Sequence, residues 1–304
     1  MKIFMTGGTG FVGSFLSKEL AQNGHDITIL TRREKPPEPA HPSISYLTGD
    51  PTKEGGWMAR VPEHDWVINL AGASVFGYWT EKKKKEIYDS RILTTRNLVR
   101  AITQGDRHTV LCSTSAPGYY GSRGEETLTE DSLPGDDFLG RVAKDWEDEA
   151  FKAQKEGIRV VITRFGIVLG KGGGVLAQLV PLFKAYMGGP AGDGSQWFSW
   201  IHRLDQVRGY MFLFDHPEIS GPVNLCAPNP VRNWDLAKAL GRVLGRPSFL
   251  RAPAFMLRLA MGEMAEVILT GQKMIPKKLL DAGFQFQFPT IDEALADLLR
   301  ESGG

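Results

Sequence analysis

Thr6-Gly7-Gly8-Thr9-Gly10-Phe11-Val12-Gly13 lies near the start of this 304-residue chain and decides its fold. The stretch follows an apolar run at residues 2–6 and precedes an amphipathic segment at residues 11–23, so its glycines lie between a predicted strand and a predicted helix. Glycines there permit a tight turn and let the backbone approach a pyrophosphate, while the helix N-terminus supplies amide donors. The sequence therefore predicts a dinucleotide-binding turn in preference to a purely structural one.

Short apolar runs and longer helical patterns alternate after this turn. Strands are expected at residues 27–31, 66–70, 109–113 and 159–165, and helices at residues 81–104 and 137–155. Repeated strand–helix units of this kind form a parallel sheet that is covered on both faces. The predicted fold class is therefore α/β, a Rossmann-type doubly wound parallel sheet, with a smaller, mixed and mainly helical C-terminal lobe.

The texture of the sequence changes near residue 170, where glycines become frequent at positions 170–174 and 188–194. We place a dinucleotide-binding Rossmann domain at residues 1–170 and a smaller substrate lobe at residues 171–304. Parts of residues 196–227 are expected to return to the first sheet. The lobe is predicted to contain strands at 197–201 and 223–226 and helices at 175–186, 204–214, 233–244, 254–269, 276–282 and 291–300.

Charge and cysteine content exclude several classes of partner. The chain has 36 Lys and Arg against 35 Asp and Glu, which gives no general attraction to nucleic acid or to an anionic membrane. Cys112 and Cys226 lack the paired spacing of a zinc site, so no metal is expected. No segment approaches the roughly 20 continuous apolar residues of a membrane span. We expect a cytoplasmic protein, a monomer or a homodimer, that acts on a small-molecule substrate.

The end of the second predicted strand bears on the choice of cofactor. It reads Thr31-Arg32-Arg33, at a place where a NAD-selective protein usually presents an acidic residue to the ribose 2′-hydroxyl. A guanidinium can bind the 2′-phosphate of NADP instead, and each charge-assisted bond is worth about 1.5 to 3 kcal/mol. The alternative is that both arginines are ordinary surface residues. Their position at the end of a strand favours NADP(H).

Further landmarks follow in order along the first 170 residues. Asp50 follows the third strand, Asn69-Leu70-Ala71-Gly72 the fourth, Ser113-Thr114-Ser115 and then Tyr120-Gly121 the fifth, and Arg164-Phe165-Gly166 the sixth. With the glycine turn, these residues resemble the extended type of the short-chain dehydrogenase/reductase superfamily. The remainder, including Gly188-Gly189-Pro190 and Trp200-Ile201-His202, resembles an atypical, epimerase-like subgroup of undefined activity, some of whose members are named cell-division inhibitors.

This resemblance implies a set of cofactor contacts. Gly7, Gly10, Phe11, Val12 and Gly13 would hold the pyrophosphate. The 2′-phosphate would be bound by Arg32, with Thr31 or Arg33 beside it, the adenosine ribose side by Leu70, Ala71 and Gly72, and the nicotinamide would lie beside Val168.

The catalytic pair of the superfamily does not carry over. The usual pair is a Tyr and a Lys four residues apart on one helix, where the ammonium lowers the pKa of the phenol. When Glu147 is matched to the Glu that usually follows the Lys by one turn, Leu139 takes the Tyr position and Ala143 the Lys position. A shift of one residue in either direction supplies no Tyr–Lys pair. The sequence therefore predicts a non-standard active site.

Arg91 is a second departure, because the superfamily usually has an Asn at this position of the preceding helix. A guanidinium there brings a permanent charge and five donors, and could bind cofactor phosphate or ribose, or a substrate carboxylate. The structural alternative is a salt bridge to Asp89 or Glu86. We favour a contact with the cofactor.

Four residues are candidates for catalysis. Ser115 ends the fifth strand, where the superfamily's Ser polarises a carbonyl or hydroxyl group, and Tyr119 or Tyr120 could supply the missing acid. His202 lies in an aromatic-rich strand that could cover the junction of the two lobes. For the tyrosines and for His202, packing or internal hydrogen bonding is the competing interpretation.

Two functions are compatible with these residues. The first is an NADP(H)-dependent oxidoreductase or epimerase acting on a small polar substrate with an unusual proton relay. The second is a non-catalytic NADP(H)-binding sensor or partner-binding protein that has lost its acid and base. The absent Tyr–Lys pair favours the second, whereas the glycine-rich, aromatic second lobe favours the first. No GxSxG, metal triad or P-loop supports a hydrolase or transferase.

Overall fold

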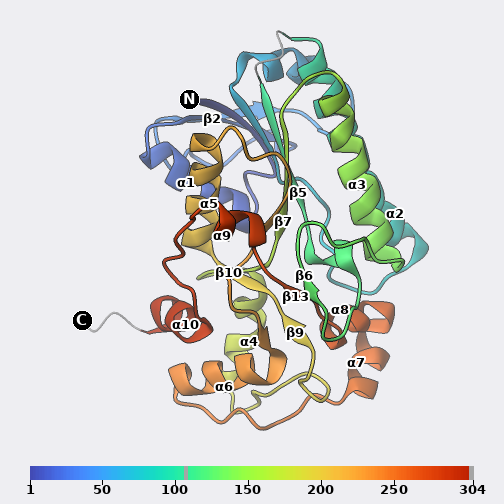
Figure 1. The fold of residues 1–304 in the computed structure, drawn as a ribbon, viewed down its shortest axis with the longest axis vertical. Helices are drawn as coiled ribbons and strands as arrows, with labels where there is room; N and C mark the ends of the chain where they lie inside the picture. The colour runs from blue at the N-terminus through green and yellow to red at the C-terminus, as the bar shows by residue number, and fades with distance from the viewer. Residues whose placement is uncertain (106–108, 301–304) are drawn as a thin grey trace.

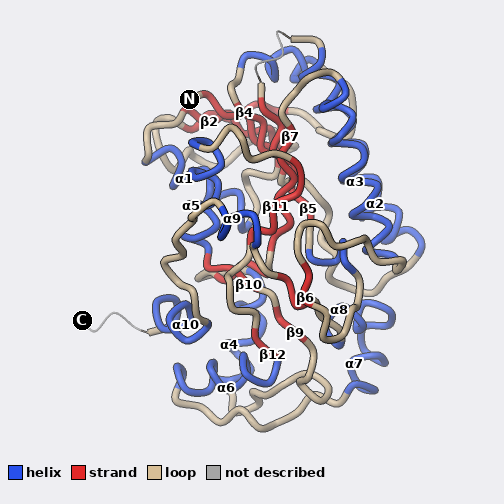
Figure 2. The backbone as a smooth tube through the Cα atoms, in the orientation of Figure 1, coloured by secondary structure: helices blue, strands red, loops and turns tan. Residues whose placement is uncertain are grey.

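The computed structural model describes residues 1–105 and 109–300 and is built on a seven-stranded sheet. The strand order is β11-β7-β5-β4-β1-β2-β3, and every neighbouring pair is parallel (Figures 1 and 2). The predicted Rossmann-type sheet is therefore confirmed. Its strands are β1 (Lys2–Thr6), β2 (Asp26–Thr31), β3 (Ile44–Thr48), β4 (Trp66–Asn69), β5 (Val110–Ser115), β7 (Val160–Phe165) and β11 (Gly221–Leu225).

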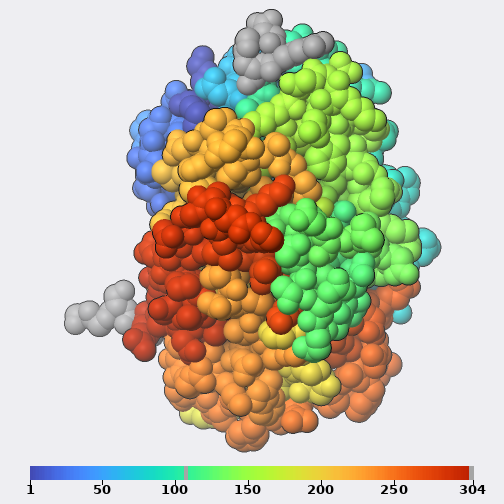
Figure 3. Space-filling model, in the orientation of Figure 1, coloured from blue at the N-terminus to red at the C-terminus, as the bar shows by residue number. Residues whose placement is uncertain are grey.

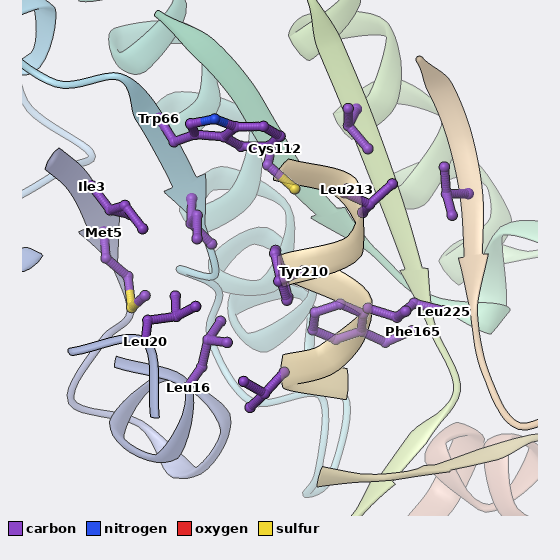
Figure 4. Close-up of a cluster of buried hydrophobic side chains, with 14 of the residues drawn as sticks. Ile3, Met5, Leu16, Leu20, Trp66, Cys112, Phe165, Tyr210, Leu213 and Leu225 are labelled. Atoms are coloured by element: carbon purple, nitrogen blue, oxygen red, sulfur yellow. The ribbon is translucent and has the colours of Figure 1, made fainter. Parts of the chain in front are cut away.

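Helices cover both faces of this sheet, because successive side chains of its strands are apolar and point in opposite directions. Ile3 and Met5 of β1 pack with α1 (Phe11–Gln22) and α5 (Arg203–Asp215) on one face (Figure 4). Phe4, between them, packs on the other face, which is covered by α2 (Glu81–Thr103), α3 (Phe138–Lys155) and the 3-10 turn η1 (Gly56–Glu63). Each face of the sheet therefore has its own apolar core.

The C-terminal part of the chain forms a smaller, mixed and mainly helical region, as predicted. Its orange residues occupy the lower end of the molecule in Figure 3. Leu176, Trp200, Leu236 and Leu295 belong to its core, which α4, α6 and α10 surround. Its helices are α4 (Gly174–Lys184), α6 (Asn233–Leu244), α7 (Ala254–Met261), α8 (Ala265–Leu269), α9 (Lys277–Asp281) and α10 (Ile291–Leu299), with the 3-10 turn η3 (Gly262–Met264).

Three two-stranded pairs complete the structure. They are β10 (Trp200–His202) with β8 (Ile167–Leu169), β12 (Val231–Arg232) with β9 (Trp197–Phe198), and β13 (Lys273–Met274) with β6 (Thr127–Leu128). A single strand at residues 197–201 was expected, and that expectation is wrong. The run divides at Ser199, whose hydroxyl donates to the carbonyl of Gln272 (2.6 Å) and accepts from the amide of Met274 (2.9 Å).

Two further features concern how the lobes are connected. The expected helix at residues 254–269 is interrupted at Gly262, where φ is +60°. Residues 203–225 run back along the Rossmann sheet as α5 and β11, and α5 packs beside α1. The division into residues 1–170 and 171–304 stays a prediction, and residues 301–304 of that range lie outside the described residues.

Within residues 1–105 and 109–300, no helix has both the length and the apolar character needed to cross a membrane.

Candidate functional site

The glycine turn connects β1 to α1 in a geometry that requires glycine at two positions. Gly7 has a φ of +69°, and a Cβ on it would lie 2.7 Å from the carbonyl of Leu70. A Cβ on Gly13 would lie 2.4 Å from the carbonyl oxygen of Gly7. Gly10 is the N-cap of α1 and makes no side-chain capping hydrogen bond, so the first amides of the helix are left for an external acceptor. The turn is therefore shaped to bind an anion.

A cavity of about 460 Å³ opens beside this turn. It brings together four of the predicted cofactor residues, Gly10, Phe11, Val12 and Val168. Its other lining residues are Thr9, Ser14, Phe15, Lys18, Lys171, Gly172, Arg203 and Gln206. The sequence alone did not identify the charged and amide side chains of this second set, which are Lys18, Lys171, Arg203 and Gln206. Only Lys171 carried a signal, because it lies in the glycine-rich run after the sixth long strand.

The end of β2 holds the residues predicted to bind the 2′-phosphate. Thr31 is buried, and its hydroxyl accepts a hydrogen bond from the amide of Arg33 (3.2 Å). Arg32 and Arg33 are exposed, and neither forms an ion pair within the part of the chain that the structure describes. Because Leu30 pairs with Thr6 in the adjacent strand, both arginines lie just beyond the level at which the glycine turn begins. Their charges are therefore free for a ligand.

The loop after β4 is tied to the glycine turn by hydrogen bonds. The amide of Leu70 donates to the carbonyl of Thr6 (3.2 Å), and the amide of Ala71 donates to the Thr6 hydroxyl (3.3 Å). That hydroxyl donates in turn to the side chain of Asn69 (2.7 Å). Leu70, Ala71 and Gly72 are thus held next to the turn, on the side opposite to the β2 arginines in the strand order.

Arg91 of α2 reaches this loop. Its Nη1 donates to the carbonyls of Ala73 (3.1 Å) and Ile87 (2.9 Å), and its guanidinium lies 5.2 Å from the centre of the Trp146 ring. A Cβ on Gly72 would lie 3.0 Å from Cζ of Arg91 and farther from its nitrogens, so Gly72 covers the flat face of the guanidinium. Neither of the predicted structural partners, Asp89 or Glu86, pairs with it: they bind lysines of the same helix.

The electrostatic surroundings of Arg91 are unusual for a cation. No carboxylate among the described residues forms an ion pair with it, and burial lowers its pKa to about 10. Neither Nε nor Nη2, the two donors that form the bidentate edge of a guanidinium, makes a hydrogen bond to any described residue. Arg91 therefore presents a charge that no described carboxylate pairs with, and one free edge, at the loop that follows β4.

Of the predicted catalytic residues, Ser115 keeps a free hydroxyl, whereas Tyr119 packs against Arg164. Ser115 ends β5 and is 1% exposed, and its hydroxyl has no hydrogen-bond partner in the described structure. Tyr119 belongs to the 3-10 turn η2 (Pro117–Tyr120), with its ring 3.5 Å from Cζ of Arg164. Burial raises the pKa of this phenol, and the charge of Arg164 acts in the opposite direction.

Tyr120 lies in the interior, which corrects its interpretation as an acid. Its hydroxyl donates to the side chain of Asn224 (2.6 Å) and accepts from Nη1 of Arg164 (2.9 Å). The same guanidinium forms two hydrogen bonds with the buried carboxylate of Glu147 (2.9 and 2.7 Å). Tyr120 is fully buried, so its phenol joins η2, β7 and β11 together and is not presented to a ligand.

His202 is also an internal residue, and the structure assigns it a role in packing. Its Nδ1 accepts from the amide of Leu204 (3.1 Å), so the proton is on Nε2, which donates to Asp297 (3.2 Å). The ring lies 3.9 Å from that of Phe288 and is fully buried. Burial, the largest effect, lowers the pKa of His202 and keeps the ring neutral. It therefore caps α5 and fixes α10.

The helix expected to carry the Tyr–Lys pair presents other residues. Leu139 packs against Gly118 of η2, and Ala143 is buried. Lys144 is half exposed and forms an ion pair with Asp148, one turn along the same helix. The ammonium of Lys144 therefore points to solvent.

Two family models and several relatives match the sequence of this chain. Residues 3–226 match the sequence model of the NAD dependent epimerase/dehydratase family, and residues 252–298 match a domain of unknown function, DUF1731. The epimerase family protein YfhF of Bacillus subtilis is 40% identical, over 99% of each chain. The chloroplastic epimerase family protein SDR39U1 homolog of Arabidopsis thaliana is 39% identical, over 99% of this chain and 87% of its own.

A solved structure is similar along the same length. It is that of human epimerase family protein SDR39U1, isoform 2, with NADPH. Its sequence is 30% identical, the TM-score is 0.86, and the match covers 98% of this chain and 99% of the human one.

Proposed function

Because the chain belongs to the NAD dependent epimerase/dehydratase family, we propose that it is an NADP(H)-binding, epimerase-like oxidoreductase. Its substrate is a small polar molecule, and its active site lacks the Tyr–Lys pair. A nicotinamide bound there supplies or accepts a hydride. The residues of this chain hold that cofactor, exclude water from it and position the substrate.

The observation that carries the proposal is the pairing of the glycine turn with two unpaired arginines. Gly7 and Gly13 allow a backbone approach that no side chain could share, and the first amides of α1 are uncapped. Arg32 and Arg33 lie one strand away, and no carboxylate of residues 1–105 and 109–300 forms an ion pair with them. A dinucleotide with a 2′-phosphate satisfies both features. That the human relative is solved with NADPH supports this choice.

Arg91 contributes a third contact to the cofactor in this proposal. Its free Nε and Nη2 edge lies at the loop that includes Leu70, Ala71 and Gly72, which is expected to follow the ribose side of the dinucleotide. A phosphate or ribose oxygen there would compensate the buried charge. Val168, which lines the same cavity as the glycine turn, would lie beside the nicotinamide.

Ser115 and Tyr119 are the residues we assign to the proton relay. The Ser115 hydroxyl is buried at the end of β5 and has no partner among the described residues, so in this proposal its unused donor is assigned to a carbonyl oxygen of the substrate. A positioned acid or base contributes roughly 10² to 10⁴-fold to a rate. Since Leu139 and Ala143 cannot ionise, we expect slow turnover of simple alcohols and of ordinary nucleotide sugars.

Leu139 and Ala143 of α3, which cannot ionise, favour a second function, that of a non-catalytic NADP(H)-binding sensor. A screen for oxidation of NADPH by small polar aldehydes and ketones, monitored by the absorbance of the nicotinamide, separates the two functions. An enzyme gives turnover that Ser115→Ala reduces. A sensor binds NADPH without turnover of any compound, and failure to bind NADPH contradicts both.

A further inference from the structure

We propose that the cavity beside the glycine turn contains a phosphate-binding site formed by Lys18, Lys171, Arg203 and Gln206. These residues come from α1, from the segment between β8 and α4, and from α5. None of them belongs to the cofactor contacts expected from the glycine turn or from the β2 arginines. Where the phosphate is that of the dinucleotide, the site rests on the proposed function and adds side chains to it; where it belongs to a second molecule, the site goes beyond that function.

The charge of the cavity wall is the first observation. Its twelve lining residues include three cations and no carboxylate. None of the three cations forms an ion pair within residues 1–105 and 109–300. The Arg203 guanidinium lies 4.3 Å from the centre of the Phe15 ring, which fixes its position without neutralising it. A concentration of one sign of charge in a hollow attracts an ion of the opposite sign.

Unused hydrogen-bond donors at the inner end of the cavity are the second, independent observation. Gln206 is 1% exposed, and its Nε2 has no hydrogen-bond partner in the described structure. Nε of Arg203 is buried and also lacks a partner. A buried donor without an acceptor costs about 1 to 3 kcal/mol, so native proteins rarely leave two side by side on one helix. An oxygen-rich ligand would satisfy both.

The backbone adds to the same field. α1 begins at Phe11 and α5 begins at Arg203, and both first residues line the cavity, so the positive ends of two helix dipoles meet there. These two helices lie side by side on one face of the sheet (Figure 1). Two dipole ends, three cations and two unpaired donors together select a multiply charged oxyanion. Phosphate has the charge and the number of acceptors to meet them.

The size and extent of the cavity point to more than a lone ion. Its volume of about 460 Å³ lies within the usual range of small-molecule sites, and Phe11, Phe15 and Val168 supply an apolar part of its wall. Lys18 follows Phe11 by two turns of α1, so the cavity runs about 10 Å along the helix from the glycine turn. The phosphate therefore comes either from the diphosphate of the dinucleotide or from a separate phosphorylated molecule.

Calorimetric titration of three variants tests the site and distinguishes these two sources. Lys18→Ala and Lys171→Ala remove exposed charges, and Gln206→Leu removes the buried amide while retaining its bulk. The control is Lys155→Ala, an equal loss of charge at the exposed end of α3. Each protein is titrated with NADPH and NADH, and with inorganic pyrophosphate before and after saturation with NADPH.

Loss of one charge-assisted contact should weaken phosphate binding about tenfold or more. If the ligand is the cofactor diphosphate, each variant weakens NADPH and NADH by the same factor, and the saturated protein does not bind pyrophosphate. If the ligand is a separate molecule, the variants leave the affinities for NADPH and NADH unchanged. The wild-type protein saturated with NADPH then binds pyrophosphate, and the variants do not. Unchanged titrations in all three variants, or equal effects in Lys155→Ala, overturn the proposal.

Gln206→Leu guards against a purely structural explanation. Replacing a buried amide that has no partner should leave the melting temperature unchanged or raise it. Weaker binding without a lower melting temperature therefore reports on the ligand. Should the wild-type protein bind neither dinucleotide, the proposed function fails, but titration with pyrophosphate still decides the existence of this site.

Discussion

Replacement of Arg91 by Met should weaken the dinucleotide without weakening the fold. Burial lowers the pKa of this guanidinium to about 10, which corresponds to roughly 3 kcal/mol of lost solvation in the charged form. Among the described residues, two backbone carbonyls, those of Ala73 and Ile87, and the ring of Trp146 compensate it, and no carboxylate does. Methionine retains much of the side-chain volume and removes the charge. We therefore expect the free energy of unfolding to stay within about 1 kcal/mol of wild type, because the relieved solvation cost offsets the lost hydrogen bonds.

The expected loss of affinity follows from the free edge of the guanidinium. Two charge-assisted hydrogen bonds at about 1.5 kcal/mol or more each are worth at least a hundredfold together if both reach the ligand, and tenfold if one does. Because Arg91 is separated from the β2 arginines by the glycine turn, the loss should be the same for NADPH and NADH. Calorimetric titration and thermal unfolding of the same samples measure both quantities.

Arg96→Met is the matched control, since Arg96 lies on the same helix and forms two hydrogen bonds of 3.2 Å with the buried carboxylate of Glu149. It should lower stability and leave cofactor affinity unchanged, because it removes both Arg96 hydrogen bonds to Glu149 and leaves this carboxylate with Lys152 (2.8 Å) as its ion-pair partner. The reasoning about Arg91 is refuted if Arg91→Met binds both dinucleotides as tightly as wild type, or if it unfolds as readily as Arg96→Met.

Three further changes test other parts of the site. Arg32→Ala should weaken NADPH roughly ten- to hundredfold and leave NADH nearly unchanged, as measured by titration; an equal loss of both would indicate misfolding. Gly13→Ala should abolish binding of both cofactors and lower the melting temperature, because its Cβ would lie 2.4 Å from the carbonyl oxygen of Gly7; a variant that binds normally would contradict the geometry of the turn. On any substrate found by screening, Ser115→Ala should reduce the steady-state rate more than Lys144→Ala, since Lys144 is directed to solvent, and the reverse order would show that the proton relay has been placed wrongly.

The fold was predictable because each of its determinants is local. Strand β1, the glycine turn and α1 follow one another within the first 22 residues, and the alternation of apolar runs with amphipathic segments repeats the unit. The strand boundaries of the second lobe were less predictable, because they depend on contacts between distant residues. The aromatic run at 197–202 reads as one strand, but Ser199 bonds to the distant residues Gln272 and Met274 and divides it.

The candidate site was predictable where a backbone position determines function, and less so where a long-range contact does. The glycines of the turn and the strand-end arginines were identifiable from their sequence positions. Tyr120 and His202 look available in sequence, but their partners Asn224 and Asp297 lie about a hundred residues away and bring them into the interior. Arg203 gave no sequence signal, because only the packing of α5 beside α1 brings it to the cavity.

Titration of the wild-type protein with NADPH and with NADH, at one fixed ionic strength, tests the central claim most directly. The ionic strength must be held constant because salt screens the exposed arginines at the end of β2. The account predicts one dinucleotide per chain, with NADPH bound at least tenfold more tightly than NADH. Equal affinities, tighter binding of NADH, or no binding of either dinucleotide would contradict it.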